Sequence, residues 1–189
     1  MKATNYIKGF TIIELLIVIV VIAVLAAISI VAYSGIQQRA NNAAIIDAAS
    51  KSYRLIQLYV AESGSYPISS GSVCITTESG CSTASSSVPA NSIFDANMVK
   101  IGTLPRSIPN AGSSNNGIYI TYAATTWNGD AQPLRMTYYL PGVNQKCGID
   151  RVSQYAYPGY LPSTTGYTYN NIDSSGKTLC WISIPGPSS

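Results

Sequence analysis

The apolar and polar positions divide the chain into two parts of different character. Residues 10–33 are apolar apart from Thr11, Glu14 and Ser29, and neither Gly nor Pro interrupts them. At 1.5 Å per residue such a run forms a helix of about 36 Å, longer than a bilayer core of about 30 Å. Its length and its place near the N-terminus therefore predict a membrane-spanning helix, although the β-branched run 17–22 would also suit a strand.

Helical spacing continues beyond this apolar run. Ser34-Gly35 weakens a helix, and we expect a bend there. Apolar residues then recur at three- and four-residue steps, and a glycine and a proline shortly after Glu62 favour a helix end near that residue. A helix over 10–62 is about 80 Å long. Its first half therefore has to lie in a membrane or among copies of itself.

From residue 63 onward, short apolar runs alternate with Ser, Thr, Gly and Pro, as in antiparallel β-structure. Strands are expected at 118–127, 134–140 and 178–184, with a fourth, short strand among the tyrosines of 155–169. The turn signal Asn128-Gly129-Asp130 predicts that the first two form a hairpin. Residues 69–92 are low in complexity and are expected to be a loop. The predicted fold class is α+β, with a small antiparallel sheet packed on the C-terminal half of the long helix.

Charge and composition narrow the function classes. Charged residues make up 10% of the chain and the net charge is +3, while residues 63–189 carry six cations and five anions. This balance gives no strong nucleic-acid signal. The chain contains no histidine, which excludes Ser-His-Asp and Cys-His nucleophiles and His-ligated metal sites.

Two groups of polar residues could suggest a catalytic or metal site, but each is interpreted as part of a turn. Ser175 and Lys177 are interpreted as a solvated turn rather than a nucleophile pair. Asn170, Asn171 and Asp173 are interpreted as a polar turn rather than a Ca²⁺ loop, because only one carboxylate is present. We therefore expect no enzymatic activity, no cofactor and no metal.

The charges around the apolar run predict its orientation. Lys2 and Lys8 precede it, so the positive-inside rule places the N-terminus in the cytoplasm and the rest of the chain outside. A secretory signal peptide is the alternative, although its apolar core would be only about 7–15 residues long. The small residues of 23–27 leave ordinary signal peptidase open. Glu14 is either an interfacial acid near the headgroups or a charge that awaits a partner.

The segment Lys8-Gly9-Phe10-Thr11-Ile12-Ile13-Glu14-Leu15-Leu16 closely resembles the class III signal of bacterial type IV prepilins and pseudopilins. The short leader 1–9 is similar to those of the type IVa class. The resemblance implies that prepilin peptidase cleaves between Gly9 and Phe10 and N-methylates Phe10. Glu14 corresponds to the signature acid of the family, and its carboxylate can reach the Phe10 amine of a neighbouring subunit and set the axial register. Loss of the leader lowers the net charge from +3 to +1, because Lys2 and Lys8 leave with it.

The resemblance also implies the lollipop organisation of pilins, a long helical spine with a globular head. The expected segments are a leader at 1–9, a transmembrane or filament-core helix at 10–33, its amphipathic continuation at 34–62 and an extracellular, β-rich head at 63–189.

Four cysteines, none in a CxxC pattern, indicate disulfides formed outside the cytoplasm. Of the three possible pairings we favour Cys74–Cys81, which closes a small loop, together with Cys147–Cys180, which ties 178–184 to an earlier segment. The second pair resembles the C-terminal disulfide loop of many type IV pilins. A zinc site made of four thiolates is the less favoured alternative, because the spacing is wide.

The sequence is thus interpreted as a structural subunit of a type IV pilus-like surface filament, with adhesion, twitching motility or DNA uptake as possible tasks. Its expected partners are further copies of itself, prepilin peptidase, the pilus assembly platform with its ATPases, and the inner membrane before assembly. The first alternative is a pseudopilin of a type II secretion system. The second is a membrane-tethered binding or enzymatic domain that never polymerises, for which cleavage at Gly9–Phe10 would have no use.

Overall fold

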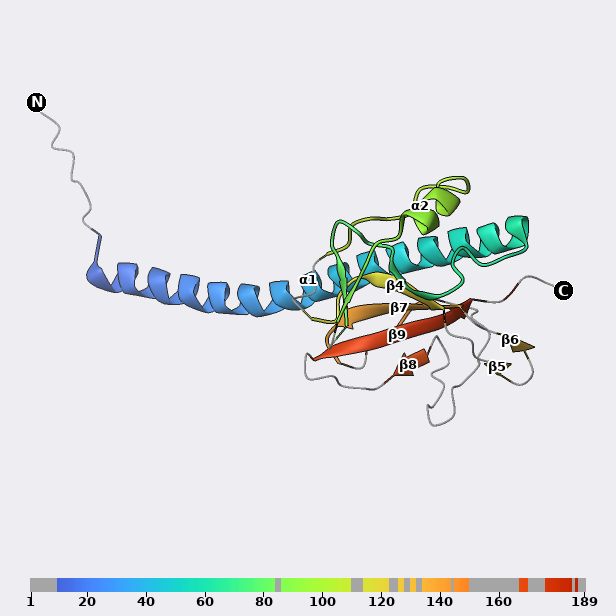
Figure 1. Cartoon of the computed structure of the whole chain (residues 1–189). Coiled ribbons are helices and arrows are strands. Elements are labelled where there is room, and N and C mark those ends of the chain that lie inside the picture. The colour runs from blue at the N-terminus through green and yellow to red at the C-terminus, as the bar shows by residue number, and fades with distance from the viewer. Residues whose placement is uncertain are drawn as a thin grey trace, which may run out of the picture. The chain divides into compact units, whose positions relative to one another are not determined.

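A computed structural model (Figure 1) describes residues 10–83, 86–109, 114–122, 126–127, 130–131, 134–143, 145–149, 167–169, 176–184 and 186. The chain forms two compact units that meet between Arg39 and Ala40.

A single helix, α1 (Ile12–Ser63), begins in the first unit and ends in the second. In the first unit its large apolar side chains are exposed, from Ile12 at 85% to Val18 at 49%. The predicted weak point at Ser34-Gly35 does not interrupt the helix. A lone glycine costs a helix only about 1 kcal/mol relative to alanine, which the long run of helical neighbours tolerates.

In the second unit, one face of α1 packs on the core and the opposite face is exposed to solvent. The buried positions recur at three- and four-residue steps, as an amphipathic helix requires; they are Ile45, Ala48, Ala49, Ser52, Tyr53, Ile56 and Val60. The helix ends close to the predicted place. Gly64 adopts a φ of +64° and donates its N–H to Val60 O at 3.0 Å, the arrangement of a glycine helix cap.

The main sheet has five antiparallel strands in the order β1-β4-β7-β9-β8. They are β1 (Gly71–Cys74), β4 (Ile118–Tyr122), β7 (Leu134–Pro141), β8 (Tyr167–Tyr169) and β9 (Lys177–Ile184). Two small ribbons pair β2 (Cys81–Ser82) with β3 (Ser87–Val88) and β5 (Thr126–Trp127) with β6 (Asp130–Ala131). A short helix, α2 (Ser92–Met98), completes the unit. The predicted α+β fold, a long helix followed by a small antiparallel sheet with disulfide loops, is confirmed.

Alternation along the strands sends side chains to two different clusters. Met136, Tyr138 and Leu140 of β7 face the main core with the buried side of α1. Tyr139, between them, faces the opposite side of the sheet, where it joins Tyr119 in a smaller cluster around Cys74 and Cys81. The period-two alternation of a strand explains this division. Figure 1 shows β4, β7 and β9 beside the part of α1 in this unit.

Two predictions about local structure need correction. Residues 69–92 were expected to be a loop, yet β1, β2 and β3 form within them. β1 is held by pairing with β4, in the register Val73↔Ile120, and such a distant partner leaves little trace in a Ser-rich sequence. The expected strand 118–127 is two strands, β4 and β5, in its described residues.

The sequence analysis did not foresee α2. Asn91 Oδ1 caps this helix by accepting hydrogen bonds from the N–H groups of Ile93 and Phe94, at 2.9 and 3.0 Å. Phe94 and Met98, one turn apart, are both buried. The cap and the four-residue spacing were a readable signal, although seven residues make a weak one.

Candidate functional site

The start of α1 brings Thr11 and Glu14 together. The backbone N–H of Thr11 donates to Glu14 Oε2 at 2.9 Å, and the Thr11 hydroxyl donates to the same oxygen at 2.7 Å. In return, the backbone N–H of Glu14 donates to Thr11 Oγ1 at 3.3 Å. These reciprocal bonds form a capping box, which satisfies free N–H groups at a helix start. The T-x-x-E spacing was readable in the sequence and was missed.

The capping box determines what Glu14 can do within a single chain. The carboxylate lies in the first turn of α1, where the helix dipole favours negative charge. Both contacts use Oε2, and Oε1 accepts no hydrogen bond from any residue that the structure describes. The carboxylate is therefore oriented by its own helix and keeps one oxygen available for a further donor. Phe10, next to the cap, is 77% exposed, while Gly9 and the leader lie outside the described residues.

The segment that follows the cap is apolar on every side. Within the described part of the chain, α1 is long and apolar enough to cross a membrane. Large apolar side chains on all its faces, from Ile12 to Ile30 and again at Tyr33 and Ile36, are exposed in the isolated chain. A helix that is apolar all round requires a bilayer or other protein around it.

Both favoured cysteine pairs are present as disulfides in the second unit. Cys74–Cys81 joins β1 to β2, and Cys147–Cys180 joins the segment after β7 to the middle of β9. All four cysteines are buried and none is free. A zinc site of four thiolates therefore has no ligands left.

Each disulfide is fixed by its surroundings. Gly117, with a φ of +87°, passes so close to the first that a Cβ there would lie 2.5 Å from Cys81 Sγ. At the second, the Tyr138 hydroxyl donates to the Cys147 carbonyl at 2.5 Å, deep in the main core. Burial raises the pKa of Tyr138 well above its usual value. Both disulfides thus belong to the packed interior.

The environment of Lys177 differs from the predicted one. The residue was interpreted as part of a solvated turn, but it is the first residue of β9 and is only 7% exposed. Its Nζ donates to the carbonyls of Ser114 and Asn115 at 2.6 and 3.1 Å. Pairing of β9 with the end of β7 draws the side chain inward, and backbone oxygens satisfy the ammonium group. Ser175 and the turn Asn170, Asn171 and Asp173 lie outside the described residues.

An ion pair joins α2 to Arg106, which also contacts the residue directly after β1. Arg106 Nη2 lies 2.7 Å from Asp95 Oδ1, and Nη1 donates to Ile75 O at 3.0 Å. Both side chains are partly exposed, so the contribution to stability is modest, about 1 kcal/mol or less. Arg106 is thus engaged in the fold of the head.

Comparison with known proteins identifies the class of the N-terminal segment. Residues 4–30 match the family model described as the prokaryotic N-terminal methylation motif. The chain therefore carries the class III signal of type IV pilins and prepilins, and the resemblance is confirmed. No curated protein matches the chain, and no solved structure does.

The motif and the apolar helix support a type IV pilin-like or pseudopilin-like protein. The match includes Gly9, Phe10, Thr11 and Glu14 and ends within the apolar run, so the head is characterised by its own structure alone.

Proposed function

We propose that this protein is a structural, non-enzymatic subunit of a type IV pilus-like surface filament. The observation that carries the proposal is the exposed, all-round apolar helix that begins at the capped pair Thr11–Glu14 inside the matched motif. Water cannot accommodate such a surface, since exposing apolar area costs about 25 cal/mol per Å². A bilayer covers it before assembly, and the helices of neighbouring subunits cover it in the filament.

Processing prepares the chain for assembly. Prepilin peptidase removes residues 1–9 by cutting between Gly9 and Phe10 and then methylates the new amine of Phe10. Lys2 and Lys8 keep the leader in the cytoplasm, so that residues 10–33 span the inner membrane, residues 34–62 continue the helix and the head of 63–189 lies outside.

Glu14 then sets the register between subunits. Its free Oε1 accepts a contact from the Phe10 amine of a neighbouring subunit while Thr11 holds Oε2. At about 4 Å and an effective dielectric constant of about 20, the attraction is roughly 4 kcal/mol before desolvation is subtracted. Burial of both charges removes part of this gain, but burial of an unpaired carboxylate in an apolar core would cost considerably more free energy. Pairing therefore favours one axial position over its neighbours.

The partners follow from the same class of assembly. An assembly platform and its ATPases extract the subunit from the inner membrane and supply the work, and further copies of the chain form the filament. The two disulfides of the head suit a subunit that works outside the cell. They favour a surface pilus over the pseudopilus of a type II secretion system, the second candidate.

The proposal is tested by Glu14→Ala in cells where this chain is the only major subunit. The control is Glu62→Ala, which removes an exposed acid from the same helix outside the apolar segment. We expect both variants to reach the membrane fraction at normal levels. Filament yield after shearing should fall at least about tenfold for Glu14→Ala only, the equivalent of about 1.4 kcal/mol per subunit contact. Normal yield from Glu14→Ala would contradict the pairing role, and failure of the unaltered chain to form filaments would contradict the proposed function.

A further inference from the structure

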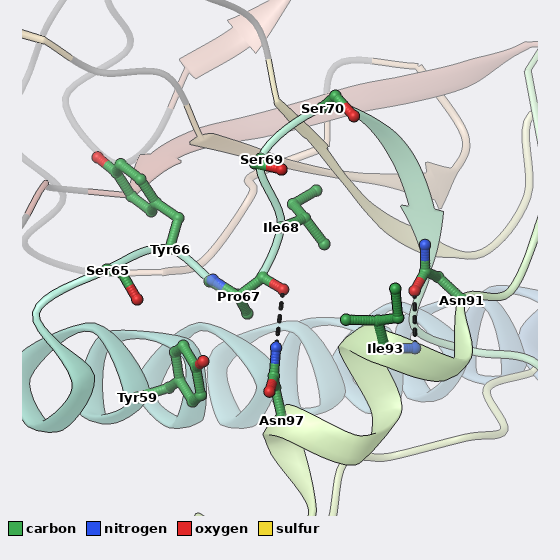
Figure 2. A pocket seen from close by; sticks show the side chains of 10 residues that line it. All are labelled: Tyr59, Ser65, Tyr66, Pro67, Ile68, Ser69, Ser70, Asn91, Ile93 and Asn97. Carbon is green, nitrogen blue, oxygen red and sulfur yellow. Dashed lines mark hydrogen bonds between the residues drawn. The ribbon is translucent and has the colours of Figure 1, made fainter.

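A cavity of about 370 Å³, widely open to solvent, lies in the second unit between the end of α1, the segment 65–70 and α2 (Figure 2). Its volume falls in the range of small-molecule sites, about 300–1,000 Å³. Ten residues line it, and none of them is charged. Those that matter most for recognition are Tyr59, Ser69, Ser70, Ile93 and Asn97.

One contact joins two residues of the lining, and two further contacts anchor Tyr66 to residues outside it. Asn97 Nδ2 donates to Pro67 O at 3.3 Å and thereby joins α2 to the segment 65–70, as Figure 2 shows. The Tyr66 hydroxyl donates to Ile184 O at 3.2 Å, and its ring meets Tyr122 edge-on with centroids 6.2 Å apart. These contacts fix the positions of Asn97, Pro67 and Tyr66 and so limit the reorganisation that a ligand would require there.

The polar groups of the lining favour a neutral ligand. Asn91 Oδ1 already accepts from the N–H groups of Ile93 and Phe94 at the start of α2, which leaves little there for an anion. With no charged side chain in the lining, an ionic ligand would lose hydration without gaining a counter-charge. Among the described residues, the hydroxyls of Tyr59, Ser69 and Ser70 have no hydrogen-bond partner, and Asn97 Oδ1 accepts none. Hydroxyls both donate and accept, so they match ligand hydroxyls in either orientation.

Apolar surface accompanies these polar groups. The Tyr59 ring lies on α1 beside Asn97, and Ile93 lies on α2 on the other side of the Asn97–Pro67 bond, with 70% of Ile93 exposed (Figure 2). Sugar rings carry hydroxyls around their rim and C–H groups on their faces, and the C–H faces pack on aromatic and aliphatic side chains. Ser69 and Ser70 are exposed, so a lipid chain would displace water from their hydroxyls without replacing the lost hydrogen bonds.

We propose that this cavity binds one or two rings of a neutral saccharide. Ser69, Ser70 and Asn97 hydrogen-bond its hydroxyls, while Tyr59 and Ile93 pack on its C–H face. All of these residues belong to the second unit, so binding needs neither filament assembly nor the apolar segment 10–33.

The test is an NMR titration of the full chain in micelles of a detergent without a sugar headgroup. The probes are galactose, N-acetylglucosamine, lactose and chitobiose, with glucuronate as the charged comparator. We expect saturable shifts of the Ser69, Ser70 and Asn97 amides with at least one neutral probe, and weaker binding of glucuronate. Absence of saturation with every neutral probe, or equal binding of glucuronate, would overturn the proposal.

A matched pair of variants tests whether the saccharide binds in the cavity. Ile93→Ser removes apolar surface from its rim, whereas Val99→Ser makes the same kind of change at the end of α2, where the side chain is 75% exposed and does not line the cavity. Ile93→Ser should weaken binding about tenfold and Val99→Ser should leave it unchanged. Equal effects of the two, at equal thermal stability, would place the binding elsewhere and refute the assignment.

Discussion

The two disulfides should contribute unequally to the stability of the head, because they close loops of different size. Cys147–Cys180 spans 33 residues of chain and Cys74–Cys81 spans 7. The entropy that a cross-link removes from the unfolded chain corresponds to ~3.7 kcal/mol for the larger loop and ~2.4 kcal/mol for the smaller one. Replacement of each pair by two alanines should therefore lower the free energy of unfolding by amounts that differ by 1.5RT ln(33/7), ~1.4 kcal/mol before rounding of the two values.

The four cysteine sites are alike in burial, although Cys147 and Cys180 lie in the main core and Cys74 and Cys81 in the smaller cluster. Each cysteine is at most 5% exposed, so each double variant loses two buried sulfur atoms and leaves similar cavities. The larger loop carries one additional consequence. Cys180 lies in the middle of β9, opposite Tyr138 on β7 and Thr168 on β8. Its loss should also loosen the final strand.

The assay is guanidinium unfolding of the full chain in micelles, followed by the near-ultraviolet circular dichroism of the buried tyrosines. This signal reports tertiary packing of the head and not the helix in the micelle. The variant without Cys147 and Cys180 should unfold first, the variant without Cys74 and Cys81 second and the unaltered chain last. An equal or larger loss on removing the smaller loop would refute the loop-size reasoning, and insensitivity of the unaltered chain to reductant would refute the disulfides.

Three further changes have defined outcomes. Gly117→Ala should destabilise the head by more than about 2 kcal/mol, seen as a lower melting temperature, since its Cβ would lie 2.4 Å from a backbone carbonyl oxygen at a φ of +87°. Tyr138→Phe should cost about 1–3 kcal/mol, because the buried Cys147 carbonyl loses its donor. Burial raises the pKa of Tyr138, and that of Tyr66 to about 12, so the stability they contribute is complete below about pH 10 and declines as the pH rises further and the unfolded chain ionises. Unfolding measured from pH 8 to 11 should show a shallower decline for Tyr138→Phe, and an unchanged slope would argue against this residue. Thr11→Val should open the capping box and speed amide hydrogen exchange at Glu14, and unchanged exchange would mean that the box contributes nothing.

The elements predicted well were those whose signals are local and strong. The end of α1 was set by a glycine that adopts the left-handed conformation, and the pairing of β4 with β7 followed from alternation on both sides of a turn signal. β1 and α2 were not predicted, because they are short and are stabilised by contacts with residues distant in the sequence. Burial of Lys177 likewise depends on carbonyl oxygens some 60 positions earlier in the chain.

The candidate site was predictable in its residues but not in its geometry. The order Gly9, Phe10, Glu14 predicted the N-terminal methylation motif that residues 4–30 match. The bond between Thr11 and Glu14 was not predicted, because Glu14 was interpreted only as a charge in the membrane or for a neighbouring subunit, and not as part of a helix cap. The cavity beside Tyr59 could not be predicted at all. Its walls come from three segments whose proximity is a result of folding, and no pattern within any one of them indicates a pocket.

Processing of the N-terminus tests the proposed role most directly. Surface filaments are sheared from cells, and the intact mass and N-terminal peptide of the subunit are measured by mass spectrometry. A pilin-like subunit predicts a mature chain that starts at Phe10, lacks residues 1–9 and carries a methyl group on its amine. A chain that keeps residues 1–9 and remains in the membrane fraction, in cells with active prepilin peptidase, would contradict it.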